Sequence, residues 1–185
     1  MKFIFIHCTG GAPDECWYPW LKGELEKLGH RVIIPRFPTP EGQSLENWMK
    51  VFEPYLKKID ENTVFIGRSI GPPFILRILE KIDIQIRAAF LVAGFCSYLK
   101  MPEFAPLVDS FIKKPFDWKK INLNCKEFYV YHGADDPVVS LHYGKELNKK
   151  VNGKLTVIDD GGHFNIGTPY SYKFEKILED IKKLE

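Results

Sequence analysis

Short apolar segments rich in β-branched and aromatic residues alternate along this chain with amphipathic segments of helical period, and no other feature constrains the fold as strongly. Repeated β-α units imply a mostly parallel sheet with helices on both faces, joined by right-handed crossovers. We therefore expect an α/β three-layer sandwich around a twisted sheet, with Ser44 as the N-cap of the second helix. The expected strands are 2–7, 31–34, 63–66, 87–93, 126–132 and 154–158, and the expected helices are 17–28, 45–59, 73–82, 140–150 and about 169–183.

Residues 94–124 interrupt this alternation, because they hold Pro102, Pro106 and Pro115 among many aromatic side chains. We expect short helices or an irregular excursion over the ligand site there. The 185 residues suffice for one sizeable core, and no repeat, low-complexity tract or linker divides them. A single domain covering residues 1–185 is therefore the prediction.

The composition narrows the classes of partner. A formal net charge of +2 leaves no strong field for nucleic acid or for an anionic membrane surface. The four cysteines lie far apart without zinc spacing, so we expect reduced buried thiols. We also expect no metal and no organic cofactor. The apolar opening, residues 1–6, is too short for a signal segment, and no run approaches the roughly 20 apolar residues of a membrane helix. We expect a cytoplasmic protein, and the sequence does not indicate its oligomeric state.

A candidate nucleophile stands between an expected strand and an expected helix. The pentapeptide Gly67-Arg68-Ser69-Ile70-Gly71 follows the strand at 63–66 and precedes the helix at 73–82. In a nucleophile elbow, the serine occupies the tip of a strained strand-to-helix turn, with its hydroxyl above the end of the sheet. Both glycines fit this geometry, since the helix must pass close to the strand that it has just left. Ordinary helix capping by Ser69 is the alternative.

An acid and a histidine follow Ser69 in the order that such an elbow requires, each in a loop after a strand. The strand at 126–132 runs into Asp135 and Asp136, and the strand at 154–158 runs into a glycine-rich loop that holds His163. A serine hydroxyl needs a base within hydrogen-bond reach, and an imidazole can take its proton and return it to a leaving group. A carboxylate fixes the tautomer of that imidazole. Ser69, Asp136 and His163 are therefore the predicted catalytic residues.

The other histidines lie at strand ends, before a strand or at the start of a surface helix, and such positions are typical of structural or solvated residues. They are His7, His30, His132 and His142.

The acid has a close competitor. Successive side chains of an extended loop point in opposite directions, so only one of Asp135 and Asp136 can face His163. The pattern Gly-x-x-Asp-Pro-x-Val favours Asp136. Asp159 and Asp160 share the loop of His163, and we expect them to cap or solvate that turn.

A tetrahedral intermediate also needs backbone N–H donors. We expect one from Ile70, the residue after the nucleophile, and one from the turn after the first strand, where Thr9 is the favoured donor. That turn contains neither the G-x-G-x-x-G nor the G-K-[ST] pattern of nucleotide-binding loops. A cysteine at this strand end, Cys8, is typical of a small buried residue rather than of a thiol nucleophile.

With these residues placed, the chain resembles the α/β-hydrolases, and more narrowly the small serine hydrolases typified by retinoblastoma-binding protein 9 and its bacterial relatives. The resemblance covers nearly the whole chain and implies a compact core with little cap. It also implies the catalytic roles given above for Ser69, Asp136 and His163. Cys8 departs from the glycine that many α/β-hydrolases carry in a His-Gly turn, which leaves the exact oxyanion donor open. The segments that carry the resemblance are 6–10, 17–22, 38–41, 44–48, 67–71, 135–137 and 162–164.

The sequence thus predicts a serine hydrolase that cleaves a small carboxylic ester or related acyl compound through an acyl-enzyme. An amidase or peptidase would use the same three residues, and a binding module could keep the fold without turnover. The segment 123–127 fits an L-x-C-x-E pattern associated with pocket-protein binding, but it runs into an expected buried strand, so we interpret it as a coincidence. Candidates for lining an acyl pocket are Phe37, Phe95, Tyr98, Phe104 and Phe164.

Overall fold

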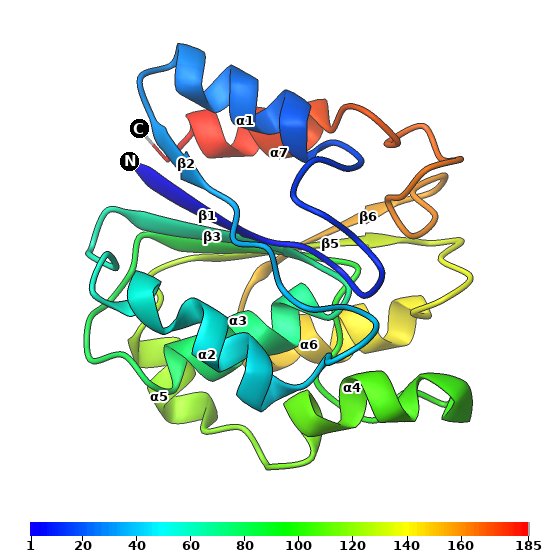
Figure 1. Ribbon diagram of the computed structural model, residues 1–185. Helices are drawn as coiled ribbons and strands as arrows, with labels where there is room; N and C mark the ends of the chain where they lie inside the picture. The colour runs from blue at the N-terminus through cyan, green and yellow to red at the C-terminus, as the bar shows by residue number, and fades with distance from the viewer. Residues whose placement is uncertain (185) are drawn as a thin grey trace.

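The computed structural model describes residues 1–184, which form a six-stranded sheet with helices on both faces (Figure 1). The strand order is β2-β1-β3-β4-β5-β6, and every neighbouring pair is parallel. This is the architecture that the alternating segments predict. The strands are β1 (Lys2–Ile6), β2 (Arg31–Ile33), β3 (Thr63–Arg68), β4 (Ala88–Val92), β5 (Phe128–Gly133) and β6 (Lys154–Ile158).

Two apolar cores lie on opposite faces of the sheet. Side chains alternate along β1, so Phe3 and Phe5 belong to one core while Ile4 and Ile6 belong to the other. Helices α1 and α7 cover the first core, and the remaining helices cover the second (Figure 1). The helices are α1 (Tyr18–Lys27), α2 (Leu45–Leu56), α3 (Gly71–Leu79), α4 (Ala105–Ile112), α5 (Trp118–Leu123), α6 (Leu141–Val151) and α7 (Glu175–Lys182).

The predicted helix ends are right in some places and wrong in others. Ser44 caps α2 as expected, because its side chain accepts a hydrogen bond from the Asn47 N–H. The last helix, α7, begins at Glu175, several residues after the predicted start. The preceding segment forms turns instead, because the Ser171 hydroxyl accepts a bond from the Gly167 N–H and donates to the Thr168 carbonyl.

The segment between β4 and β5 contains short helices, as predicted. A 3₁₀ turn at Pro102–Phe104 leads into α4, and α5 follows before β5 begins. Val108 and Phe111 of α4 join the second core. This segment therefore packs against the sheet layer while reaching the edge at which the strands end.

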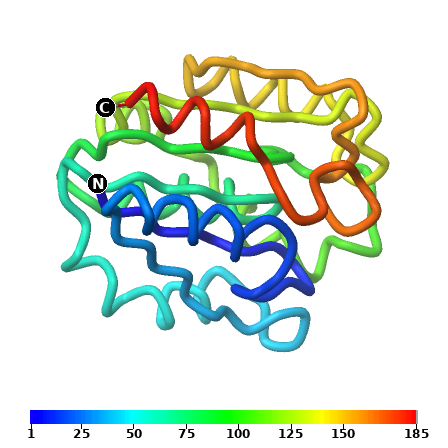
Figure 2. The backbone as a smooth tube through the Cα atoms, turned by 90° about the horizontal axis from the view of Figure 1, so that it is seen from above, coloured from blue at the N-terminus to red at the C-terminus, as the bar shows by residue number. Residues whose placement is uncertain are grey.

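The carboxyl ends of all six strands meet at one edge of the sheet, while the two termini lie at the opposite edge (Figure 1 and Figure 2). Strand β3 runs two residues further toward the first edge than predicted, because Gly67 and Arg68 continue the pairing with Leu91 and Val92 of β4. Within the described residues, no helix is long and apolar enough to cross a membrane.

Candidate functional site

Ser69 occupies a sharp turn between β3 and α3. Its φ of 60° lies in the left-handed region, which non-glycine residues seldom adopt. The Ser69 N–H donates to the Val92 carbonyl at 2.9 Å, which ties the turn to β4. A Cβ on Gly67 would lie 2.7 Å from Ile75 Cδ1, and one on Gly71 would lie 2.7 Å from the Ile6 carbonyl oxygen. Both glycines are thus required by close packing of the helix on the sheet.

His163 and Asp136 are joined by a buried hydrogen bond. The Nδ1 of His163 donates to Asp136 Oδ2 at 2.8 Å, and each residue is only 8% exposed. The other carboxylate oxygen of Asp136 accepts from the N–H groups of Val138 and Val139 at 2.8 and 2.9 Å. These three donors fix the carboxylate rigidly in the orientation that faces His163.

Asp135 has a different role from its neighbour. Its side chain points to the exposed side of the loop and accepts a bond from the Gly162 N–H at 2.8 Å. It therefore ties down the loop that carries His163 without touching the imidazole. Asp159 and Asp160 are exposed, as expected for residues that solvate a turn.

One pocket of about 210 Å³ brings Ser69 and His163 together. Its polar lining comes from Cys8, Thr9, Arg68, Ser69, His163 and Asn165. Its apolar lining comes from Phe95, Leu99, Phe104, Val108, Val138 and Val139. Asp136 lies behind His163 and outside this lining, so a molecule in the pocket meets the hydroxyl and the imidazole but not the carboxylate.

The predicted aromatic lining is partly right. Phe95 and Phe104 line the pocket. Phe37 instead stacks on Trp48 with ring centroids 4.5 Å apart, and Phe164 stacks on Phe174 at 5.0 Å. Tyr98 is 55% exposed and lies outside the lining.

The two expected oxyanion donors lie near Ser69. Thr9 lines the pocket, and its hydroxyl accepts a bond from Gln43 Nε2 at 2.9 Å, which holds the turn after β1. Ile70 follows Ser69 and forms the N-cap of α3. Across residues 1–184, the backbone N–H groups of Thr9 and Ile70 have no hydrogen-bond acceptor.

Two buried histidines lie at this edge and remain neutral. The Phe37 N–H donates to His7 Nε2 at 2.9 Å, so the His7 proton is on Nδ1, which bonds the Cys8 carbonyl. His132 bonds the Val139 carbonyl through Nε2 at 2.6 Å. Burial lowers the pKa of both imidazoles. Each histidine thus acts structurally, which agrees with the prediction from their positions.

Sequence reasoning missed how close His132 is to the acid. Its Nε2 lies 3.7 Å from Asp136 Oδ2, and its Nδ1 is buried without a hydrogen-bond partner. The signal was the spacing of four residues between His132 and Asp136. The N–H at Nε2 is directed to the Val139 carbonyl, which places the ring beside the carboxylate that holds His163.

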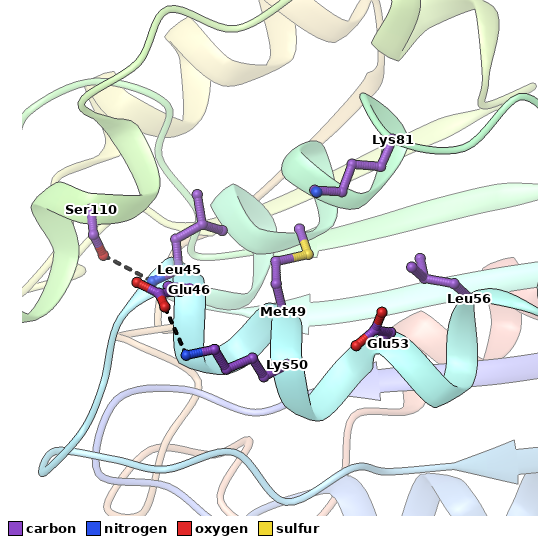
Figure 3. A pocket seen from close by; sticks show the side chains of 8 residues that line it. All are labelled: Leu45, Glu46, Met49, Lys50, Glu53, Leu56, Lys81 and Ser110. Atoms are coloured by element: carbon purple, nitrogen blue, oxygen red, sulfur yellow. Dashed lines mark hydrogen bonds and ion pairs between the residues drawn. The ribbon is translucent and has the colours of Figure 1, made fainter.

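A larger pocket lies elsewhere. Its volume is about 580 Å³, and it runs along α2 under the ends of α3 and α4 (Figure 3). Leu45, Met49 and Leu56 line it beside charged side chains. The Ser110 hydroxyl accepts a hydrogen bond from the Leu45 N–H. Its lining holds no histidine. In residues 1–184, no cluster of three or more His, Cys, Asp or Glu side chains could hold a metal ion.

Comparison with known proteins identifies the family and the fold. The family model described as "Serine hydrolase" matches residues 3–180. YdeN of Bacillus subtilis strain 168 is 32% identical over 165 residues, which cover 88% of this chain and 85% of that protein. The crystal structure of the ydeN gene product matches with a TM-score of 0.92 at 28% identity, over 99% of this chain and 97% of that one.

Two other proteins extend the comparison. Serine hydrolase RBBP9 of Rattus norvegicus is 26% identical over 186 residues, covering 99% of this chain and 95% of that protein. Est1E from Butyrivibrio proteoclasticus, solved with ferulic acid bound, shares the fold with a TM-score of 0.72 at 17% identity, over 98% of this chain and 86% of that one. From the family match and the relative in Bacillus, the chain belongs to the serine hydrolase family and has the α/β-hydrolase fold.

Proposed function

We propose that this serine hydrolase cleaves a small carboxylic ester through an acyl-enzyme formed on Ser69. One observation carries the proposal: His163 is bonded at 2.8 Å to the buried carboxylate of Asp136, while its ring lines the same pocket as Ser69. Because Nδ1 carries the proton in that bond, Nε2 is left as the basic nitrogen. Asp136 thus orients the imidazole, and His163 serves as general base and acid.

The reaction has two steps. His163 Nε2 takes the Ser69 proton as the oxygen attacks the ester carbon, and the imidazolium then protonates the departing alcohol. Water, activated by the same nitrogen, hydrolyses the acyl-enzyme to release the carboxylic acid and regenerate the serine. The unpaired N–H groups of Thr9 and Ile70 are our candidates for holding the oxyanion in both steps.

The pocket and the fold neighbours favour an ester with an apolar acyl group. Phe95, Leu99, Phe104 and Val108 form an apolar wall beside Ser69. The neighbour Est1E binds ferulic acid, a carboxylic acid of the kind that an esterase releases. Amide hydrolysis by the same residues is the second candidate reaction.

A fluorophosphonate probe and two matched substrates test the proposal. We expect the probe to label the wild type and not Ser69→Ala, and p-nitrophenyl butyrate to be hydrolysed faster than the corresponding p-nitroanilide. Ser69→Ala and His163→Ala should each lower kcat by about 10⁴-fold or more. Faster hydrolysis of the anilide would indicate an amidase. Failure of the probe to label the wild type would indicate a binding module on this fold.

A further inference from the structure

Arg68, which precedes the nucleophile, is a buried cation in contact with sulfur. Its side chain is 5% exposed, and its Nη2 donates to Cys8 Sγ at 2.6 Å. Its Nη1 donates to the Phe164 carbonyl at 2.8 Å and approaches Cys16 Sγ at 3.6 Å. The Nε is buried without a partner. The guanidinium therefore has an unpaired N–H at Nε and faces two thiols.

No carboxylate of the described residues forms an ion pair with Arg68. A buried charge without a compensating partner is costly. Neighbouring groups that can carry a negative charge are therefore the candidates for compensating Arg68. Those groups are the thiols of Cys8 and Cys16 and the phenol of Tyr18. Burial raises the pKa of Cys16 and of Tyr18, which keeps both protonated at neutral pH.

Cys8 differs from the other cysteines in both contact and location. It alone bonds the guanidinium within 3 Å, and it lines the pocket that holds Ser69. Burial raises the pKa of Cys96 to about 12 and raises that of Cys125 as well. Neither of these cysteines lines the catalytic pocket. A neighbouring cation and access from a pocket are the two features that mark a reactive thiol.

We propose that Cys8 is a covalent modification site for small, soft electrophiles, and that its modification closes the pocket to substrates of Ser69. The consequence for hydrolysis rests on the proposed function, whereas the modification itself does not. With a haloacetamide, the Cys8 sulfur displaces the halide and forms a carbon–sulfur bond, and the thiol proton passes to solvent. The added group then occupies part of the 210 Å³ space beside the nucleophile.

Iodoacetamide tests the proposal on the native protein. Alkylation of each cysteine is followed with time by peptide mass spectrometry, and each sample is then exposed to the fluorophosphonate probe. We expect Cys8 to react at least tenfold faster than Cys96 or Cys125, and probe labelling of Ser69 to fall in step with Cys8 alkylation. Equal or slower reaction of Cys8 would overturn the proposal, and so would full probe labelling of Cys8-alkylated protein.

Four variants separate the possible causes. Labelling of Cys8→Ala by the probe should no longer respond to iodoacetamide. In Arg68→Met, and in Arg68→Lys as a milder change, Cys8 should react several-fold more slowly while Cys125 is unaffected. In Ser69→Ala, Cys8 should react as in the wild type. If the probe fails on the wild type but Cys8 still reacts fast, the proposed hydrolysis is wrong and the modification site stands.

Discussion

Two buried arginines lie near opposite ends of α3, and their surroundings differ. Arg77, 3% exposed, pairs with Glu80 at 2.8 Å, donates to the Phe111 carbonyl at 2.8 Å and stacks 3.7 Å from the Phe116 ring. Arg68, equally buried, has thiols and one carbonyl as partners and a buried nitrogen without any. The charge of Arg77 is compensated by a carboxylate, whereas the charge of Arg68 is not.

This contrast separates a structural region from a reactive one. The surroundings of Arg77 satisfy every charge and clamp α3 to the segment between β4 and β5. The edge at Arg68 collects unpaired polar atoms and left-handed residues, namely Ser69, Ala93 and Phe164. Such strain concentrates at functional sites, where the surrounding structure maintains it. Substitutions at the two ends should therefore affect different properties.

The largest expected effect concerns the acid at the reactive edge. Asp136→Asn should lower kcat/KM by about 10⁴-fold, because an amide cannot hold the His163 tautomer. Asp135→Asn is the matched control and should cost only a few-fold, because an amide oxygen can still accept the Gly162 N–H. Ester hydrolysis under identical conditions measures both variants. The reverse ranking would reassign the acid.

The next largest effect is a loss of folding stability at Arg77, near the C-terminal end of α3. Arg77→Met should lower the free energy of unfolding by about 3–5 kcal/mol, because it leaves the Glu80 carboxylate and several carbonyls without their partner. Arg68→Met should cost less, because no carboxylate loses its partner there. Urea unfolding of both variants gives the comparison. Equal losses would mean that the two arginines do not differ as their contacts indicate.

A smaller loss of folding stability is expected at Gly144, which packs against the His132 ring behind Asp136. A Cβ on Gly144 would overlap the His132 ring, which lies beside Asp136. Gly144→Ala should therefore lower the free energy of unfolding by about 1–3 kcal/mol through overpacking. Gly23→Ala, also within a helix but with open space around it, should stabilise by up to about 1 kcal/mol. Urea unfolding curves for the two alanine variants would show opposite signs.

The smallest effect is a pH dependence of stability. Burial lowers the pKa of His7 and His132 in the folded state, so below about pH 6.5 the unfolded chain binds protons that the folded chain does not. Stability should thus fall as pH drops from 6.5 toward the folded pKa values, by up to about 1.4 kcal/mol per pH unit for each histidine. Unfolding midpoints at pH 7.5 and 5.5 measure this loss. His132→Gln should reduce it, whereas the exposed His142→Gln should not.

Local patterns predicted the fold well because each strand and helix carries its own periodicity. The order of the strand ends likewise brought Ser69, Asp136 and His163 to one edge before any contact was known. The predicted end of β3 was wrong because pairing with β4, rather than local propensity, extends that strand. The contact between Arg68 and Cys8 could not be predicted from the sequence, because sixty residues separate them and no local pattern marks the pair.

Four of the six apolar residues that line the pocket come from one short stretch of the chain. Phe95, Leu99, Phe104 and Val108 lie between β4 and the end of α4, whereas Ser69, Asp136 and His163 each follow a different strand. Transplanting this stretch from a relative would exchange the wall as a unit and leave the chemistry in place. Under the proposed function, acyl specificity can therefore change through substitutions within this one segment, while Ser69, Asp136 and His163 stay the same.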